Sequence, residues 1–404
     1  MPENARKRPV LLVLSSTYPR WSGDHEPGFV HELARRLTDR FDVIALVPGS
    51  PGAARREDLD GVRVERYRYA PARFETLVNN GGVVTNLKRY RWKWLLVVPF
   101  CVGQLWCAIR IIRQTSPVAI HAHWLLPQGL VAALLRLLWR RTPPFVATSH
   151  GADLFALRGS LFGAIRRFVV NRAYALTVVS KAMRDELAAL GLDVSKVSVQ
   201  PMGIDLRERF TPDPTVARSK DEILFVGRLV EKKGLRHLLD AMPAILAAHP
   251  RARLTVAGFG PEESALRAQA DALGIGARVD FLGAVPQASL PALYRRATVF
   301  AAPFVRAKSG DQEGFGLVLV EALGCGCPVV ASELPATVDV LNGLRGAIAV
   351  RSGDADALSR AIGGVLSGAD EFGARAAEDR SQLVERFDWE TVRDQYADTL
   401  AGAA

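Results

Sequence analysis

The feature that most constrains this chain is an alternation of short apolar runs with longer amphipathic stretches. Runs of strand length such as "ILFV" (223–226) and "FVATS" (145–149) are each followed by a segment with helical periodicity. Strands of a parallel sheet are nearly continuous in apolar sequence, because helices cover both faces of the sheet. The alternation therefore predicts an α/β fold built on parallel sheets.

The alternation occurs in two series that are separated by a break. The first series predicts strands at 10–15, 43–47, 62–67, 118–121, 145–149, 176–180 and 197–200, and helices at 28–38, 128–139, 162–172 and 181–190. The stretch "PMGIDLRERFTPDPTVARSKD" then interrupts the pattern and predicts a linker at 201–220. The second series predicts strands at 223–226, 254–257, 279–282, 299–301, 329–331 and 347–350, and helices at 235–249, 262–273, 290–295, 316–323, 355–366 and 389–400. We expect two doubly wound halves that face each other across a cleft, with ligands at the carboxyl ends of the strands.

Size and charge narrow the class of protein. A chain of 404 residues suits two domains. The net charge of +10 fits an anionic partner, which includes nucleic acid, an anionic membrane and a phosphorylated small molecule, although abundant Ala and Arg give the same basicity without a functional meaning. The four cysteines match no zinc pattern and predict reduced thiols in a cytosolic protein. The apolar run 10–14 has strand length and no cleavage site after it, so it predicts a first strand rather than a signal peptide.

The segment 88–113 does not follow the alternation. A basic cluster precedes a mostly apolar run at 94–112, which Pro99, Gln104 and Arg110 interrupt. The run is shorter than the ~20 apolar residues that span a bilayer, so a membrane span is the least favoured interpretation. Two others stay open: a helix packed on the first domain, and a helix in a membrane interface with its tryptophans at headgroup depth and its basic residues on anionic lipid. The tryptophans are Trp92, Trp94 and Trp106, and the basic residues are Lys88, Arg89, Arg91 and Lys93.

The stretch "PFVRAKSGDQEGFGLVLVEALGCGCPVVAS" (303–332) carries two carboxylates. Glu321 lies about a turn and a half into the helix expected from Gly316, among apolar neighbours. A carboxylate there can accept hydrogen bonds from a vicinal diol such as a nucleotide ribose, and Glu313 would lie nearer the other end of the ligand. The glycines before the helix allow its backbone amides to approach a phosphate. The alternative is that Glu321 is a solvated helix residue.

Two further segments of the second half carry candidate ligand contacts. In "ILFVGRLVEKKGLRHLLDA" the cations Arg228, Lys232 and Lys233 follow a strand, where they can neutralise a diphosphate leaving group; the alternative is a solvated charged face. In "LTVAGFGPEE" the dinucleotide fingerprint fails at Glu263, so Gly258 and Gly260 predict a wall under a nucleotide base instead.

The first half carries histidines at strand ends, in "FVATSHGADLF" and "AIHAHWLLPQG". No two of His121, His123 and His150 form a tight ligand pair on one helix face, so we expect no metal site. We interpret His150 as a polar contact to a reacting sugar, the alternative being a core histidine. The polar loop from Trp21 to Gly28 follows the first strand and is expected to face the same cleft.

Together these motifs resemble the retaining glycosyltransferases of family 4, which have the two-domain GT-B fold. The resemblance covers nearly the whole chain and rests on Glu313 to Glu321 with "EALGCGCPVV", on "GRLVEKKG" (227–234), on "SHGADLF" and on "PMGID". The stretches "HAHWLLPQG" and "GDHEPGFVHELA" resemble the bacterial branch that builds polysaccharides on lipid-linked carriers. One departure is that the loop after the first strand lacks the paired glycines of many relatives.

The resemblance implies roles for individual residues. Catalytic roles fall to Glu313, His150, Arg228 and Lys233. Donor-binding roles fall to Gly227, Arg228, Lys233, Gly260, Glu313, Gly314, Phe315, Gly316, Leu317 and Glu321. Acceptor-binding roles are expected for Trp21, Asp24, Gly28, His123 and Asp153. No metal or other cofactor is expected.

The resemblance also implies an organisation and an activity. We expect an acceptor-binding domain at 1–202 with a membrane-associating helix near 88–113, a nucleotide-sugar-binding domain at 203–386, and a helix at 387–404 that crosses back. The expected reaction is retaining transfer of a sugar from a UDP- or GDP-linked donor to a glycan or polyprenyl-diphosphate-linked acceptor, for cell-surface polysaccharide or glycoconjugates. The expected location is the cytoplasmic face of the plasma membrane, peripheral on anionic lipid, without nucleic acid. The alternatives are a sugar-nucleotide epimerase or hydrolase on the same fold and a non-enzymatic lipid- or glycan-binding protein.

Overall fold

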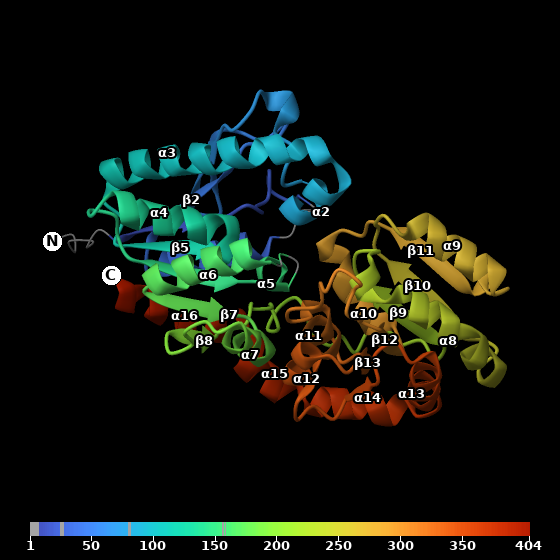
Figure 1. Cartoon of the computed structure of the whole chain (residues 1–404). Coiled ribbons are helices and arrows are strands. Elements are labelled where there is room, and N and C mark those ends of the chain that lie inside the picture. Colours follow the sequence, from blue (N-terminus) through green and yellow to red (C-terminus); the bar gives the residue numbers. More distant parts are fainter. Residues whose placement is uncertain (1–7, 25–27, 80–81, 156, 158) are drawn as a thin grey trace. The chain divides into compact units, whose positions relative to one another are not determined.

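The computed structural model describes residues 8–24, 28–79, 82–155, 157 and 159–404. The chain forms two compact units, Met1–Met202 with Val392–Ala404, and Gly203–Thr391. Each unit is a mainly parallel sheet flanked by helices (Figure 1). The prediction of two doubly wound α/β units is confirmed, and the predicted cleft between them stays a prediction.

Unit 1 holds an eight-stranded sheet in the order β3-β4-β2-β1-β5-β6-β7-β8. Its strands are β1 (Val10–Leu14), β2 (Asp42–Pro48), β3 (Arg56–Leu59), β4 (Val62–Tyr67), β5 (Ala119–His123), β6 (Phe145–Ser149), β7 (Ala175–Val178) and β8 (Val197–Val199). Only β3 is antiparallel to its neighbour among the described strands of this sheet. The strand order changes direction at β1, which pairs with β2 on one side and with β5 on the other.

The helices of unit 1 differ from the prediction mainly in the segment 88–113, which was predicted as one helix. They are α1 (Phe29–Arg36), α2 (Gly82–Arg89), α3 (Val97–Thr115), α4 (Leu130–Leu138), α5 (Ala152–Phe155), α6 (Ser160–Arg172), α7 (Lys181–Ala189) and α16 (Trp389–Ala403). The segment predicted as one helix near 88–113 consists of the end of α2, a short 3-10 helix η3 (Arg91–Leu96) and α3. Within the described residues, Arg91–Thr115 is the one stretch whose length and composition would suit a membrane span, a test that core helices of soluble proteins also pass.

Unit 2 holds a six-stranded, wholly parallel sheet in the order β11-β10-β9-β12-β13-β14. Its strands are β9 (Glu222–Val226), β10 (Arg253–Ala257), β11 (Val279–Gly283), β12 (Val299–Ala302), β13 (Val329–Ser332) and β14 (Ala347–Val350). Numbered within the unit, this is the 3-2-1-4-5-6 order of dinucleotide-binding sheets, whose ligands lie where the order reverses. In unit 2 that point is between β9 and β12, which pair side by side.

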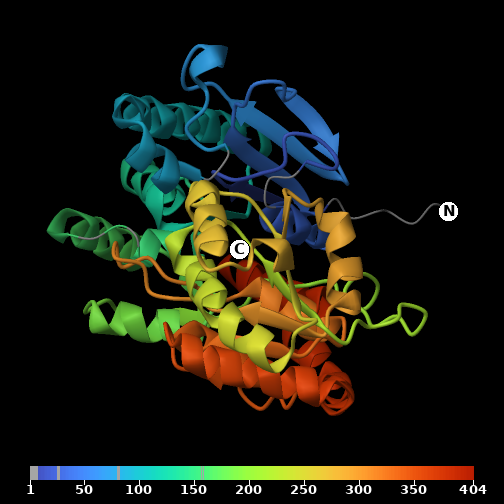
Figure 2. The ribbon, with the colours of Figure 1, turned by 90° about the vertical axis from the view of Figure 1, so that its right-hand side faces the viewer.

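The helices of unit 2 surround this sheet. They are α8 (Leu235–Ala248), α9 (Glu263–Ala272), α10 (Leu290–Arg296), α11 (Leu317–Gly324), α12 (Pro335–Leu341), α13 (Ala355–Ser367), α14 (Ala369–Glu378) and α15 (Arg380–Phe387). Figures 1 and 2 show α13 and α14 along one side of the unit. The core beside α8 and α13 is apolar and mainly aliphatic, with Leu238, Leu239 and Ile362 fully buried.

The last helix, α16, ends in unit 1. The hydroxyl of Tyr396 donates to the carbonyl of Gln200 (3.0 Å), and the amide of Gln200 donates to Thr399 (2.7 Å). The Tyr396 ring lies 5.5 Å from the ring of His121 on β5. Helix α16 therefore contacts the residue that follows the edge strand β8, through side chains nearly two hundred residues later in the sequence.

Candidate active site

The reversal point of the unit 2 sheet brings together two predicted residues of opposite charge. Lys233 lies in the loop after β9, and Glu313 lies in the loop after β12. The Lys233 ammonium donates to Oε2 of Glu313 at 2.6 Å. Two motifs eighty residues apart in sequence thus meet at the carboxyl edge, where parallel sheets bind ligands.

Close packing of these two loops sets the position of Lys233. Gly234 has φ +68°, and a Cβ on it would lie 1.7 Å from the carbonyl oxygen of Pro303. Only glycine allows this conformation and this approach together. The Val305 amide donates to the Lys232 carbonyl at 3.0 Å, which ties the loops further. The Lys233 ammonium also lies 4.4 Å from the centre of the Phe304 ring.

A second ion pair lies beside the first. The Lys232 ammonium is 3.2 Å from Oδ1 of Asp311 and also donates to the Gln312 carbonyl. The backbone amide of Lys308 donates to Glu231 at 3.0 Å. The loop 303–316 is thus fastened at several points to the loop after β9, and the exposed Arg228 lies on that same loop.

The charge state of Glu313 follows from its neighbours. Burial would raise the pKa of this carboxyl, but the positive charges of Lys233 and Lys232 and hydrogen bonds from Lys233 and the Phe315 backbone outweigh it. Together they lower the pKa to about 2. Glu313 is therefore ionised at every physiological pH.

Glu321 lies inside α11, which begins after Gly316. Its side chain is buried, with 5% of the residue exposed, so the alternative of a solvated helix residue is wrong. The Tyr294 hydroxyl of α10 donates to Oε2 at 2.9 Å, and the Gln287 amide lies 3.5 Å from Oε1. Burial raises the pKa of Glu321 to about 7, although the Tyr294 hydrogen bond and the charges of Arg209 and Lys233 act in the opposite direction.

The remaining predicted donor contacts lie around these carboxylates. Gly260 packs so closely that a Cβ would lie 2.4 Å from the Leu229 carbonyl oxygen, and the Leu229 amide donates to Phe259. The loop 258–260 therefore rests on the loop that Gly227 begins. Gly314, Phe315 and Gly316 are buried before α11, and Leu317 is half-buried at its start. The Phe315 ring packs against Phe387.

In unit 1 the histidines gather at the carboxyl ends of β5 and β6. His123 Nδ1 and His150 Nε2 are 3.0 Å apart, and the two rings are stacked with an interplanar angle of 9°. Trp124 and Phe29 pack against the same His150 ring, with centroids 5.0 and 4.9 Å away. Burial lowers the pKa of His150 to about 3 and also lowers that of His123, so both rings are neutral at physiological pH.

Two aspartates predicted to bind acceptor have internal partners. The carboxylate of Asp153 accepts from the Leu125 amide (2.6 Å) and from the Ser149 hydroxyl (2.8 Å). Asp24 accepts from the backbone amide and the guanidinium of Arg20. Both aspartates therefore stabilise the backbone of the loops in which they lie. Their contact with an acceptor stays a prediction.

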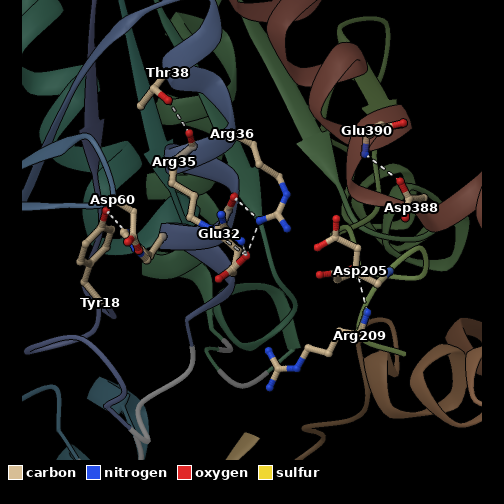
Figure 3. A network of polar contacts seen from close by, with 12 residues as sticks. Tyr18, Glu32, Arg35, Arg36, Thr38, Asp60, Asp205, Arg209, Asp388 and Glu390 are labelled. Carbon is tan, nitrogen blue, oxygen red and sulfur yellow. Dashed lines mark hydrogen bonds and ion pairs between the residues drawn. The ribbon is translucent and has the colours of Figure 1, made fainter. Parts of the chain in front are cut away.

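The other predicted acceptor residues border the loop after β1. Trp21 is 43% exposed under the Arg20 guanidinium, and Gly28 directly precedes α1. Residues 25–27 of this loop lie outside the described residues. Hydrogen bonds also hold the loop after β1, because His31 contacts both the Tyr18 hydroxyl (2.9 Å) and the Asp60 carboxylate (2.8 Å). Figure 3 labels Tyr18 and Asp60 at the two ends of this chain of contacts.

A turn at the start of unit 2 positions a charge that acts on Glu321. The carboxylate of Asp205 accepts from the backbone amides of Glu208 and Arg209 (Figure 3). The positive charge of Arg209 is one of those that lower the pKa of Glu321. Neither Arg209 nor Tyr294 was predicted as a site residue, because neither belongs to a motif and both act across sequence distance.

The described residues offer no cluster of metal ligands. Among them, no group of three or more His, Cys, Asp or Glu side chains is arranged to hold a metal ion. The expectation of a cofactor-free site stays a prediction.

Comparison with known proteins identifies the family. Residues 207–383 match the model "Glycosyl transferases group 1", and residues 29–208 match "Glycosyltransferase Family 4". A GDP-mannose-dependent alpha-(1-6)-phosphatidylinositol monomannoside mannosyltransferase of Mycolicibacterium smegmatis is 31% identical over 68% of this chain and 74% of its own. The chain belongs to glycosyltransferase family 4. It is a glycosyltransferase of class EC 2.4, and the epimerase, hydrolase and non-enzymatic alternatives are not favoured.

Other matches extend over the full length. A mannosyltransferase of the same description from Mycobacterium tuberculosis is 27% identical over 97% of this chain and 98% of its own. Sucrose-phosphate synthase from Thermosynechococcus elongatus superposes with a TM-score of 0.80 at 20% identity, covering 98% of this chain and all of that one. This likeness and the two Rossmann-like sheets confirm the predicted GT-B fold.

Proposed function

We propose that this glycosyltransferase moves a mannosyl group from GDP-mannose to a hydroxyl of a lipid-linked acceptor, with retention of the anomeric configuration. The observation that carries the proposal is the Lys233–Glu313 pair at the reversal point of the unit 2 sheet, beside the buried Glu321. The donor and the acceptor class are taken from the mannosyltransferase relatives, whose names specify GDP-mannose and a phosphatidylinositol monomannoside.

The unit 2 edge supplies the groups that a nucleotide sugar requires. Lys233 and Arg228 balance the negative charge that grows on the diphosphate as it leaves, where the transition state needs stabilisation. Glu313 is ionised and accepts hydrogen bonds from the sugar hydroxyls. Glu321 accepts hydrogen bonds from the ribose diol, and Gly316 with the first amides of α11 lies toward the phosphates.

The chemical step breaks the bond between the anomeric carbon and the diphosphate oxygen. The acceptor hydroxyl attacks from the face that the diphosphate leaves, and its proton passes to the departing phosphate oxygen. His150 contacts the sugar near the transferring carbon as a neutral ring. No metal is assigned to this step, since Arg228 and Lys233 take the charge-balancing role.

The proposed location is the cytoplasmic face of the plasma membrane, where a lipid-linked acceptor would be encountered. The proposed partners are therefore the nucleotide sugar, the lipid-linked acceptor and the anionic membrane surface. The proposed biological role is synthesis of a cell-surface glycolipid or polysaccharide.

The experiment that tests the proposal is transfer of radiolabelled mannose from GDP-mannose to phosphatidylinositol mannoside acceptors, with UDP-glucose and ADP-glucose as competing donors. We expect acceptor-dependent product from GDP-mannose, whose anomeric configuration NMR shows to match that of the donor. Release of free mannose without acceptor, or an inverted product, would refute the assignment.

A further inference from the structure

We propose that η3, α3 and the end of α4 form a docking face for an anionic lipid bilayer. This inference deepens the proposed function by naming the surface through which the enzyme meets its lipid-linked substrate, and it rests on that function only for the nature of the acceptor. Figures 1 and 2 both show α3 along the periphery of unit 1. The docking face comprises the outward side chains of Arg91–Leu138 on these three helices.

Large apolar side chains form one stripe on the outer side of α3 and η3. Leu95 is 79% exposed, Val98 70% and Trp106 74%, and Trp94 and Val102 are more than half exposed. Spacings of three and four residues place these side chains on one helix face. From Trp94 to Trp106 the stripe runs about 18 Å at 1.5 Å per residue.

The opposite side of α3 packs against the interior of unit 1. Phe100, Ala108 and Ile111 are almost fully buried, and Phe100 packs edge-on against Tyr67 and Tyr69. The orientation of α3 is therefore fixed by its inner face. The outer stripe is exposed because the core already holds the other side.

A buried lysine fixes the orientation of η3. The Lys93 ammonium donates to Oδ1 of Asn86 (2.7 Å) and to the Thr76 carbonyl (2.8 Å), and the residue is 5% exposed. The side-chain amide of Asn86 in turn donates to the Asn79 carbonyl. Lys93 is thus unavailable to lipid, which corrects the expectation that it belongs to a membrane-facing basic cluster. Its inward anchoring leaves its neighbours Trp92 and Trp94 outside.

The segment that carries the stripe has basic residues and no acidic residue of its own. Between Thr76 and Ala152 the sequence contains no Asp or Glu, but it contains Lys88, Arg89, Arg91, Lys93, Arg110, Arg113, Arg136, Arg140 and Arg141. Lys93 is internal, and Arg110 is paired with Glu65 at 2.6 Å. Arg89, Arg91 and Arg113 are exposed beside the stripe.

Aromatic rings border the stripe at both ends. At one end Trp92 packs edge-on against Phe74, and both rings are partly exposed. At the other end the Arg113 guanidinium lies 5.5 Å from the Trp139 ring, next to the exposed Leu137 and Leu138 at the end of α4. Tryptophan and arginine beside an apolar stripe are the composition of an interfacial helix, and a segment with basic but no acidic residues is complementary to anionic lipid.

The test is sedimentation of the full chain with phosphatidylcholine vesicles that contain or lack phosphatidylglycerol. We expect binding to the anionic vesicles that weakens in high salt. The triple variant Trp94→Ser, Val98→Asp, Trp106→Ser changes only exposed positions and should lower the partition coefficient by about tenfold or more. The variant Arg89→Glu, Arg91→Glu should bind anionic vesicles no better than neutral ones.

Two controls keep the outcomes separate. The variant Val338→Asp changes an exposed apolar residue of unit 2 and should bind vesicles like the wild type. Stabilisation by GDP-mannose should be equal in the wild type and in the triple variant, so a failure of the proposed donor shows as a loss in both. The inference is overturned if the wild type does not sediment with anionic vesicles or if the triple variant does so equally. It is also overturned if the wild type is a dimer in solution and the triple variant is a monomer, because the stripe would then be a dimer interface.

Discussion

The carboxyl edges of the two parallel sheets differ in charge: ionised side chains gather at one and neutral rings at the other. At the unit 2 edge, Lys233 and Lys232 pair with Glu313 and Asp311, so opposite charges lie in contact. At the unit 1 edge, burial without a nearby charge of opposite sign keeps the stacked histidines neutral. The fold therefore determines where a ligand can bind, and the local balance of burial and charge determines which side chains there are ionised. A charged edge suits a diphosphate, and a neutral aromatic edge suits a sugar.

Breaking the ion pair of unit 2 is expected to have the largest effect. Lys233→Ala removes a cation that balances the leaving diphosphate, so kcat/KM for transfer should fall by about 10²–10³-fold. In Glu313→Ala, kcat/KM should fall by a similar factor, because the sugar hydroxyls lose their hydrogen-bond acceptor. Steady-state transfer kinetics with matched circular dichroism spectra measure both.

The matched control for this pair is the adjacent Lys232. Lys232→Ala breaks the contact with Asp311 and Gln312 and removes one of the positive charges that act on Glu313, but it keeps the Lys233–Glu313 pair. Transfer should therefore stay within about threefold of the wild type. Equal losses for the Lys232 and Lys233 variants would show that the loops need general positive charge rather than the Lys233–Glu313 pair.

The second expectation concerns pH and the donor. A ribose diol binds the ionised form of Glu321, whose pKa is about 7, so GDP-mannose affinity should fall about tenfold per pH unit below 7 and level off above 8. Tyr294, Arg209 and Lys233 face this carboxyl, and burial raises the pKa of the Tyr294 hydroxyl well above its ordinary value. Both phosphates of a nucleotide sugar are esterified, so the ligand itself does not titrate there.

The control for pH dependence is Glu321→Gln. This variant should bind GDP-mannose weakly and equally at pH 6 and pH 8 in calorimetric titrations. A wild-type affinity that is flat from pH 5.5 to pH 8 would contradict the role of Glu321.

A third, smaller effect is expected at the unit 1 edge. His123 holds the His150 ring by a hydrogen bond and by stacking, so it acts as a positioning residue. His123→Asn should lower kcat by about tenfold through misplacement of His150, with little change in the KM for GDP-mannose. If the KM for the donor rises and kcat does not change, His123 acts on donor binding and this role is wrong.

The smallest effect on transfer is expected for Asp153. Asp153→Ala leaves the Leu125 amide and the Ser149 hydroxyl without their partner, which should lower the free energy of unfolding by about 2 kcal/mol. Chemical denaturation followed by fluorescence measures this loss. A raised acceptor KM without a loss of stability would show instead that Asp153 binds acceptor.

Much of the architecture was predictable because parallel strands are buried on both sides. Every predicted strand has a counterpart in the structure, and most of these strands are continuous apolar runs, although β4 (Val-Arg-Val-Glu-Arg-Tyr) is not. The strand β3 was missed because its sequence, Arg-Glu-Asp-Leu, is polar at a sheet edge. The helices α2, α5, α12, α14 and α15 were also missed; α5 and α12 are short, and α15, Arg-Ser-Gln-Leu-Val-Glu-Arg-Phe, is mostly polar.

The site was predictable only where a motif marks it. Lys233, Glu313 and Glu321 lie in motifs, and their chemistry follows from residue type. The Tyr294 hydrogen bond to Glu321 and the inward turn of Lys93 depend on packing between segments that are distant along the chain. Such contacts have no signal in a single sequence.

The most direct test of the central claim is calorimetric titration of GDP-mannose into the wild type and into Lys233→Ala. The account predicts one site per wild-type chain and an affinity loss of about tenfold or more in the variant. Equal affinity in both proteins, or no heat of binding from the wild type with any nucleotide sugar, would contradict the claim that this edge of unit 2 holds the donor diphosphate.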